Sequence, residues 1–282
     1  MKYRLRRHPL RSLLLLCVLG MLVAACGGTT PTSSSSATPT AAPAAVSLNV
    51  FAAASLTASF KEIATDYQSA HSNVKITYNF NGSQLLEQQI ANGAPADIFA
   101  SADQANMQKA TKANLVNTPQ VFARNKLVII VPASNPANIT SLKDLAKKGV
   151  KLVVGAPAVP IGNYALQILD KLGKAPDYGP TYESSVKANF VSQEENVTAV
   201  VQKVQLGEAD AGIVYRTDVT SSVASKVKII DIPDNFNVIA QYPIAVTKDS
   251  THATDAQAFE QYILSPQGQS VLTKYGFIGV TG

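Results

Sequence analysis

The 282-residue sequence contains no tryptophan, only three histidines and only two cysteines. So few thiols and imidazoles leave little material for a zinc site, a disulfide framework or a cysteine nucleophile. The absence of tryptophan argues against a sugar-binding cleft, where the indole offers the largest stacking surface, although ten tyrosines remain. No two tyrosines are adjacent, so the paired tyrosine ligands of a ferric-ion site are also missing.

Common catalytic motifs are absent as well. The sequence has no GxSxG elbow, no HExxH pair and no phosphate-binding GxxxxGK[ST] loop. Carboxylates occur in the pair Glu194-Glu195 and in residues 207–210, but nothing predicts that two of them face each other as glycoside hydrolysis requires. His71 follows a helical pattern and His252 lies in a polar stretch, so both are predicted at the surface. The sequence therefore argues against an enzyme.

Residues 1–26 have the pattern of a secretory signal. Basic residues precede the apolar run SLLLLCVLGMLVAA, which is short for a membrane span. The run ends at residues 23–26, Val-Ala-Ala-Cys, which resemble the lipobox of bacterial lipoproteins. The resemblance implies that Cys26 is lipidated and becomes the mature N-terminus. The alternative is an ordinary signal peptide in which Cys26 is incidental.

Removal of this segment changes the charge of the chain. The full sequence has 24 basic and 19 acidic residues, a net charge of +5, and five of the basic residues and none of the acidic ones precede Cys26. The mature chain keeps 19 residues of each sign and is formally neutral, so the high pI gives no support to a nucleic-acid partner. Cys17 leaves with the signal, so Cys26 is the only thiol that remains.

Residues 27–46 consist almost entirely of glycine, threonine, proline, serine and alanine and carry no charge. A segment of this composition buries too little apolar surface to fold and is predicted to be a flexible tether. A lipid at one end and a folded body at the other predict attachment to a membrane through the N-terminal lipid only.

The rest of the chain alternates strand and helix patterns. Residues 48–52 read as a buried strand, the apolar positions from Leu56 to Tyr67 recur at helical spacing, and residues 121–131 read as one long strand ending at Pro132. Repeated alternation predicts an α/β fold with parallel sheets covered by helices on both faces. Ligands of such folds lie at the carboxyl ends of strands, which is where Ser55 and Ser83 fall.

Four strand-to-helix junctions offer hydrogen-bond donors without a neighbouring lysine or arginine. The unpaired N–H groups and partial positive charge of a helix start favour an anion. Taken singly, each junction is explained as well by capping or turn chemistry, and Tyr215 by core packing. The junctions are Ser55 after three alanines, Ser83 after Gly82, Ile161-Gly162 after Pro160, and Val197 after Asn196.

A site made only of donors suits a fully deprotonated oxyanion. Hydrogen phosphate carries a proton and needs an acceptor, and no aspartate adjoins Ser55 or Ser83. Sulfate-like and molybdate-like anions are therefore favoured over phosphate. These two have the same shape and charge, so the residues alone leave the choice between them open.

Six segments, in order, resemble the periplasmic molybdate-binding proteins of bacterial ABC importers, and the resemblance covers nearly all of residues 47–280. The segments are AAASL (52–56), NGSQLLEQQIANGAPADIFASAD (81–103), NKLVIIVP (125–132), GAPAVPIGNYAL (155–166), GEADAGIVYRTD (207–218) and SPQGQSVLTKYGF (265–277).

The resemblance implies a two-lobe periplasmic-binding-protein fold of type II, with mixed, mostly parallel sheets flanked by helices and the ligand in the interlobe cleft. Lobe 1 would combine residues 47–124 with 245–282, and lobe 2 would hold 125–244. The two crossing strands are expected near residues 124–131 and 241–246.

The same resemblance implies which groups hold the ligand. Molybdate would be bound by the hydroxyls and N–H groups of Ser55 and Ser83, the backbone N–H groups of Ile161 and Val197, and the hydroxyl of Tyr215. No cofactor and no direct protein–metal bond are implied, because molybdenum is bound as its oxyanion. This sequence departs from the family at Ile161, where alanine is common, and at Asn196, where an acidic residue is frequent.

By resemblance, the protein is an exported, monomeric solute-binding protein that captures molybdate, and tungstate too, and delivers it to an ABC importer permease and its ATPase. It would be lipid-anchored to the outer face of the cell membrane or the periplasmic face of a membrane. Three alternatives stay open: a binder of another tetrahedral oxyanion such as sulfate, a sensing module, and a serine hydrolase using Ser55 or Ser83, which would need a base.

Overall fold

The computed structural model describes residues 44–280. The predicted signal, Cys26 and nearly all of the predicted tether lie outside the described residues. Within residues 44–280, no helix has the length and apolar character needed to cross a membrane.

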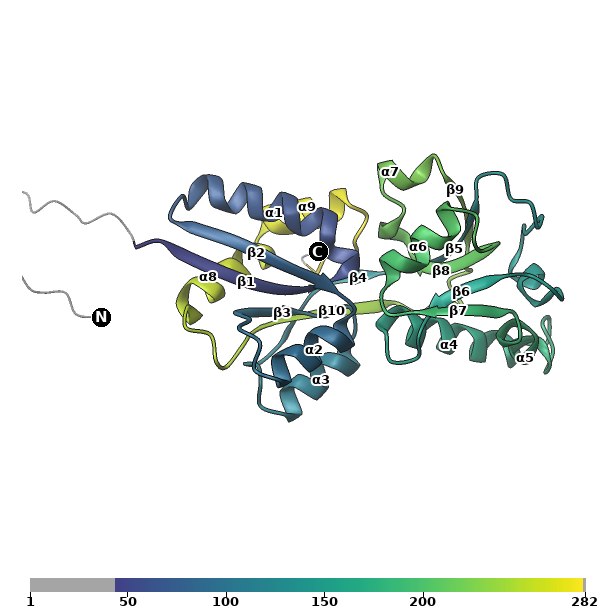
Figure 1. Cartoon of the computed structure of the whole chain (residues 1–282), viewed down its shortest axis with the longest axis horizontal. Helices are drawn as coiled ribbons and strands as arrows, with labels where there is room; N and C mark the ends of the chain where they lie inside the picture. The colour runs from purple at the N-terminus through teal and green to yellow at the C-terminus, as the bar shows by residue number, and fades with distance from the viewer. Residues whose placement is uncertain (1–43, 281–282) are drawn as a thin grey trace, which may run out of the picture. The chain divides into compact units, whose positions relative to one another are not determined.

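The described chain forms two five-stranded mixed sheets, as Figure 1 shows. The first has the order β2-β1-β3-β10-β4 and is built from β1 (Val46–Ala53), β2 (Val74–Asn81), β3 (Ile98–Ala100), β4 (Gln120–Asn125) and β10 (Ala240–Val246). The second has the order β7-β6-β8-β5-β9 and is built from β5 (Leu127–Pro132), β6 (Leu152–Gly155), β7 (Phe190–Glu194), β8 (Ala211–Tyr215) and β9 (Val227–Asp231). We call the first sheet with its helices lobe 1, and the second lobe 2.

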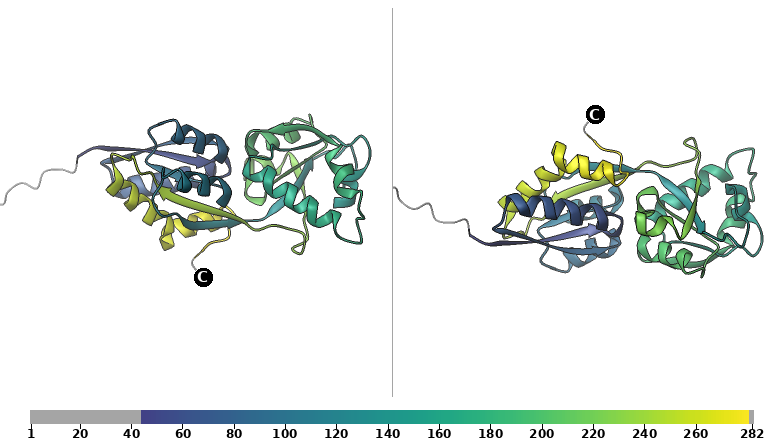
Figure 2. Two further views of the ribbon diagram at one scale, coloured as in Figure 1. Left: turned by 90° about the horizontal axis from the view of Figure 1, so that it is seen from below. Right: turned by 90° about the horizontal axis from the view of Figure 1, so that it is seen from above.

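Helices cover both faces of each sheet (Figures 1 and 2). In lobe 1, α1 (Thr57–Ala70), α8 (Ala253–Leu264) and α9 (Pro266–Lys274) pack on one face, and α2 (Ser83–Ala91) and α3 (Gln104–Lys112) on the other. In lobe 2, α4 (Pro160–Gly173) and α5 (Tyr182–Lys187) lie opposite α6 (Val197–Gln205) and α7 (Ser221–Ala224). The predicted two-lobe α/β architecture is confirmed.

Parallel and antiparallel pairs are equally frequent among the described strands. β1 runs parallel to β2 and β3, and β6 runs parallel to β7 and β8. β10 runs antiparallel to its neighbours β3 and β4. β5 runs antiparallel to its neighbours β8 and β9. The sheets are mixed as expected, but parallel pairs are not the majority. The reason is that β5 and β10 each enter their sheet from the other lobe. A helical crossover, which would place a strand parallel to its neighbour, does not precede them.

The chain crosses between the lobes twice. Residues 121–131 were predicted as one strand, but Lys126 divides them between β4 in lobe 1 and β5 in lobe 2. The return crossing lies between the end of β9 at Asp231 and the start of β10 at Ala240. Residues 241–246, expected to form this crossing, lie entirely in the sheet of lobe 1, because an apolar strand pattern does not say to which sheet the strand belongs.

Local helix patterns agree with the structure. Leu56, Phe60, Ile63 and Tyr67 are all buried along one side of α1 and the turn before it. Ser141 and Asp144 form a capping box, but it starts only the short 3-10 turn η2 (Leu142–Ala146).

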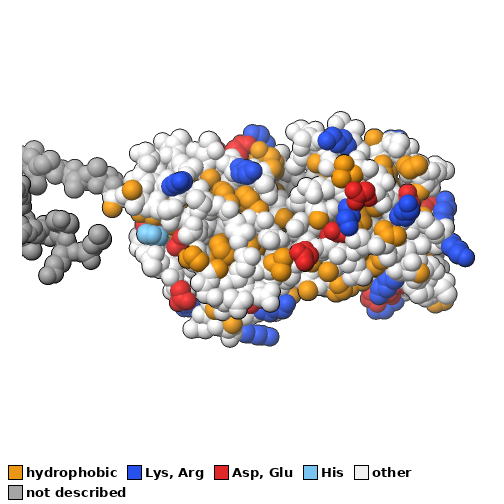
Figure 3. Space-filling model, in the orientation of Figure 1, with side chains coloured by type: hydrophobic (Ala, Val, Ile, Leu, Met, Phe, Trp, Pro, Cys, Tyr) orange, Lys and Arg blue, Asp and Glu red, His pale blue; other side chains and the backbone are white. Residues whose placement is uncertain are grey.

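Basic and acidic side chains are scattered over the face seen in Figure 3, without a patch of one sign. This agrees with the formal neutrality of the chain after residue 26.

Candidate functional site

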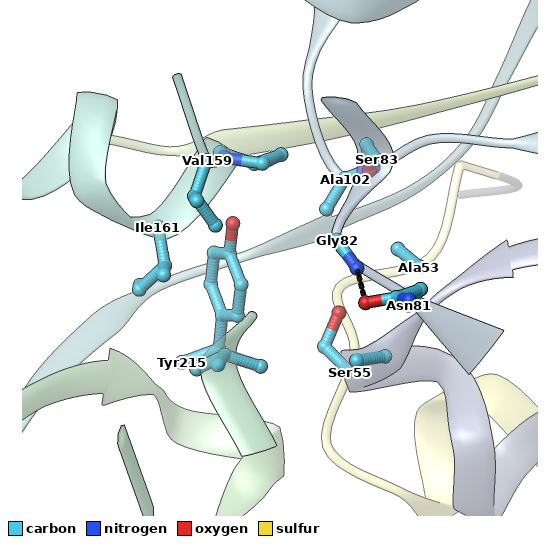
Figure 4. A pocket seen from close by; sticks show the side chains of 12 residues that line it. Ala53, Ser55, Asn81, Gly82, Ser83, Ala102, Val159, Ile161 and Tyr215 are labelled. Atoms are coloured by element: carbon cyan, nitrogen blue, oxygen red, sulfur yellow. Dashed lines mark hydrogen bonds between the residues drawn. The ribbon is translucent and has the colours of Figure 1, made fainter. Parts of the chain in front are cut away.

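A small cavity lies between the lobes, at the carboxyl ends of β1, β2 and β8 (Figure 4). Its volume is about 10 Å³, taken as the space open to the centre of a water-sized sphere. The structure brings all five residues predicted to contact the ligand to its wall. The complete lining is Ala53, Ala54, Ser55, Asn81, Gly82, Ser83, Ala102, Val159, Pro160, Ile161, Val197 and Tyr215.

The two serines of lobe 1 do not cap helices. Ser55 lies inside η1 (Ala54–Leu56), the 3-10 turn between β1 and α1, and neither η1 nor α1 has a side-chain cap. Ser83 is the first residue of α2, whose N-cap is Gly82, again without a side-chain cap. The capping explanation of these serines therefore fails, and both hydroxyls are available for other contacts.

The Ser83 hydroxyl is fully buried and has its proton free. The backbone N–H of Ala102 donates to Ser83 Oγ at 3.0 Å. Because an N–H group only donates, the serine oxygen accepts here and its own hydrogen remains available to the cavity.

Two helix starts face these serines from lobe 2. α4 begins at Pro160, so Ile161 is in its first turn, and α6 begins at Val197. The N–H groups of a first turn have no acceptor within the helix. The Asn196 side chain caps α6 by accepting from the N–H of Ala199 at 3.0 Å, which fixes Val197 as the first helical residue.

Tyr215 places a phenol at the cavity wall, at the end of β8 (Figure 4). The residue is 1% exposed, and its hydroxyl is buried without a hydrogen-bond partner. Burial raises the pKa of the Tyr215 hydroxyl well above its usual value, so the group keeps its proton. An unpaired buried donor costs about 1–3 kcal/mol, and an acceptor in the cavity would remove that cost.

No lining side chain is a lysine, arginine, aspartate or glutamate. The one side-chain acceptor of note, Asn81 Oδ1, already receives the N–H of Gly82 at 2.8 Å and Asn196 Nδ2 at 3.3 Å. The cavity thus offers neutral donors and little acceptor capacity, an arrangement suited to a deprotonated anion.

The lobes touch beside the cavity. Gln84 Nε2 in lobe 1 donates to the backbone oxygen of Glu195 in lobe 2 at 2.8 Å. A Cβ at position 82 would collide with that same oxygen, so Gly82 permits the close approach of the lobes. The structure therefore has its cleft closed around the cavity.

Sequence reasoning missed Tyr242. Its hydroxyl lies 3.0 Å from Ser55 Oγ, although 187 positions separate the two residues. Tyr242 is fully buried in β10 and looks like a core aromatic in the sequence. No local pattern could have linked it to the site, because the contact exists only once β10 has joined the sheet of lobe 1.

The residues of acid–base and metal chemistry lie elsewhere. His71 stacks on Tyr67, with ring centroids 4.0 Å apart, and His252 precedes α8; neither lines the cavity. Within the described residues, no group of three histidine, cysteine, aspartate or glutamate side chains could hold a metal ion.

Two mixed α/β lobes with a donor-lined cavity between them define a two-lobed binding protein. The chain belongs to the bacterial extracellular solute-binding protein family, whose family model matches residues 48–278. It is 39% identical over 264 residues to the molybdate-binding protein ModA of Mycobacterium bovis, covering 92% of this chain and 95% of that protein.

Two further relatives agree with this assignment. The putative ABC transporter substrate-binding lipoprotein YvgL of Bacillus subtilis is 33% identical over 244 residues, which is 82% of this chain and 86% of that protein. A solved substrate-binding domain of a putative molybdenum ABC transporter from Clostridium difficile is 33% identical with a TM-score of 0.62, covering 84% of this chain and all of the other.

Proposed function

We propose that this protein captures molybdate and delivers it to the permease and ATPase of an ABC importer. It would also capture tungstate, which is likewise a tetrahedral dianion. The observation that carries the proposal is the cavity between the lobes, lined by hydrogen-bond donors and without a charged side chain. The names of the relatives, a molybdate-binding protein and a domain of a molybdenum transporter, support this ligand.

In the proposed complex, lobe 1 contributes Ser55 and Ser83, and lobe 2 contributes the N–H groups of Ile161 and Val197 and the hydroxyl of Tyr215. Helix starts stabilise the anion through their partial positive charge. The unpaired Tyr215 hydroxyl supports its role, since bound oxyanion would give it an acceptor.

Isoleucine at position 161 is compatible with this arrangement. A Cβ on Gly155 would lie 2.7 Å from Ile161 Cγ2, so the isoleucine side chain fills space against a glycine backbone. Its backbone N–H remains in the first turn of α4, at the cavity wall. The larger side chain therefore changes packing behind the site without removing the proposed donor.

Ligand binding would close the lobes, because each lobe supplies part of one donor shell. We propose that the permease recognises this closed form of a monomer. A lipid on Cys26 would hold the protein at the outer face of the membrane, and the lipoprotein name of the Bacillus subtilis relative supports the anchor.

Sulfate is the principal competing ligand, since it has the charge and shape of molybdate. The test is calorimetric titration of the chain lacking residues 1–26 with molybdate, tungstate, sulfate and hydrogen phosphate. We expect binding of molybdate and tungstate, with weaker binding of the other two. Equal or tighter binding of sulfate would contradict the molybdate assignment.

A binding protein, and not an enzyme, is the function proposed. Neither cavity serine has an imidazole or carboxylate base among the lining residues. Turnover of a simple ester that disappears in Ser55→Ala would contradict this part of the proposal.

A further inference from the structure

A chain of buried polar groups runs from Ser55 to the crossing between the lobes. Tyr242 in β10, Asn125 at the end of β4 and Thr217 in η3 (Arg216–Asp218) are 0%, 1% and 7% exposed. Ser55 Oγ lies 3.0 Å from the Tyr242 hydroxyl. Asn125 Nδ2 lies 2.7 Å from Thr217 Oγ1 and 3.5 Å from the Tyr242 hydroxyl, the latter at the outer limit of a hydrogen bond.

The orientation of the Asn125 amide is fixed by its neighbour. The backbone N–H of Lys126 donates to Asn125 Oδ1 at 2.9 Å. Because a backbone N–H only donates, the side-chain atom facing it must be the carbonyl oxygen. The NH₂ group of Asn125 therefore faces Thr217 and Tyr242.

This orientation sets the direction of the next hydrogen bond. The Asn125 NH₂ group only donates, so the Tyr242 oxygen receives a proton from that side. Among the described residues, Ser55 Oγ is the only acceptor within reach of the Tyr242 proton. Burial raises the pKa of the Tyr242 hydroxyl well above its usual value, so the proton is present.

We infer that Asn125 and Tyr242 direct the Ser55 hydroxyl so that it presents its proton, and not a lone pair, to the cavity. Asn125 donates to Tyr242, Tyr242 donates to Ser55, and the hydrogen of Ser55 remains for the ligand. Ser83 is directed in the same way by the N–H of Ala102. Both are thus donors that another donor orients from behind.

The inference rests on the proposed anion site and names what that site selects. Two serines fixed as donors favour a tetrahedral dianion without a proton over one that carries a proton, such as hydrogen phosphate. The protonated anion has an O–H group that needs an acceptor, and the directed serines offer none. Asn125 and Tyr242 are positioning residues for this selection and do not line the cavity.

The sharpest test is Asn125→Asp, which replaces the donor by an acceptor of the same shape. Tyr242 would then donate to the carboxylate, Ser55 would donate to Tyr242, and the Ser55 lone pair would face the cavity. We expect affinity for molybdate to fall about 100-fold. Affinity for hydrogen phosphate should fall less, so that the ratio of molybdate to phosphate affinity decreases.

The ratio of molybdate to phosphate affinity distinguishes a change in the orientation of the Ser55 hydroxyl from repulsion by the new negative charge. At about pH 8 both anions are dianions, so repulsion by the new carboxylate weakens both alike and leaves the ratio unchanged. Asn125→Ala removes the donor without adding an acceptor, and Tyr242 can still donate to Ser55. We therefore expect a smaller loss of molybdate affinity in Asn125→Ala than in Asn125→Asp, the opposite of what a role in packing alone predicts.

Tyr242→Phe gives an independent measurement if Asn125→Asp does not fold. It removes the hydroxyl that donates to Ser55 Oγ. We expect about tenfold weaker molybdate binding and a lower ratio of molybdate to phosphate affinity. The matched control is Tyr78→Phe, which removes a phenol that donates to the backbone oxygen of Phe60 at 2.8 Å, away from the cavity. Its affinities and ratio should equal those of the wild-type chain.

The outcomes separate the inference from the proposed function. If wild-type protein binds molybdate but the folded variants Asn125→Asp and Tyr242→Phe keep the wild-type ratio, the inference is wrong and the proposed function stands. If wild-type protein binds none of the anions, the proposed function is wrong and the inference falls with it.

Discussion

Gln84 Nε2 of lobe 1 donates to the backbone oxygen of Glu195 in lobe 2 at 2.8 Å, across the cleft and beside the cavity. Gly82, two residues earlier, lies where any side chain would strike the same oxygen. The Glu195 carbonyl thus sets how closely the lobes approach. It accepts the hydrogen bond from Gln84 and leaves no space for a side chain at Gly82.

Gly82→Ala should therefore oppose closure. The added methyl group cannot coexist with the Glu195 oxygen in its present position, so the closed form would have to open or shift. We expect weaker molybdate binding and a larger radius of gyration by small-angle scattering in the presence of ligand. The control is Gly173→Ala at the end of α4, which does not line the cavity. There the added Cβ would lie 3.1 Å from Glu183 Cβ. Equal compaction of wild type and Gly82→Ala would count against the role of this contact.

Ser83→Ala should weaken molybdate binding by roughly 1.5–3 kcal/mol, or one to two decades, because a donor to a charged ligand is lost. Calorimetry measures this directly. The matched control is Ser59→Ala, which removes another buried serine of lobe 1, whose hydroxyl donates to the Leu56 oxygen at 3.2 Å. Wild-type affinity in Ser83→Ala would mean that this hydroxyl does not touch the ligand.

Tyr215→Phe should separate stability from binding. The hydroxyl is buried and unpaired, so its removal should stabilise the ligand-free protein by about 1–3 kcal/mol. The same change should reduce the rise in melting temperature that saturating molybdate produces. Thermal unfolding with and without molybdate gives both results. A destabilised ligand-free variant with an unchanged ligand-induced shift would contradict the assignment.

Glu260→Gln tests a carboxyl outside the site. Glu260 is 5% exposed on the buried face of α8, its Oε1 has no partner, and burial raises its pKa to about 7. The folded protein therefore holds a proton that the unfolded chain releases above about pH 4.5. Stability should fall as pH rises from about 4.5 to 7, by on the order of 3 kcal/mol, and then level off.

In Glu260→Gln the fall in stability between about pH 4.5 and 7 should be absent, and the variant should be more stable than wild type at about pH 8. Urea unfolding at several pH values checks it, with the exposed Glu208→Gln as control. Parallel stability curves for wild type and Glu260→Gln would show that the carboxyl is not perturbed as stated.

The sequence predicted the fold where periodicity is local, and it predicted residues of the cavity wall where small residues precede helix starts. The stripe from Leu56 to Tyr67 and the start of α6 at Val197 follow from spacing and capping alone. The two crossings did not follow from pattern, since residues on both sides of Lys126 are strand-forming and only tertiary pairing assigns them to different sheets. For the same reason, Tyr242 and Asn125 were not predicted near Ser55.

The absence of charged side chains from the lining of the cavity has a consequence for the response to salt. Lysines and arginines at a surface attract anions through a field that dissolved ions screen over about 10 Å at 0.1 M. Dipoles that enclose the anion after closure act at contact distance, with no electrolyte between them and the ligand. A protein working outside the cytoplasm would thereby retain its cargo in dilute and in saline surroundings alike.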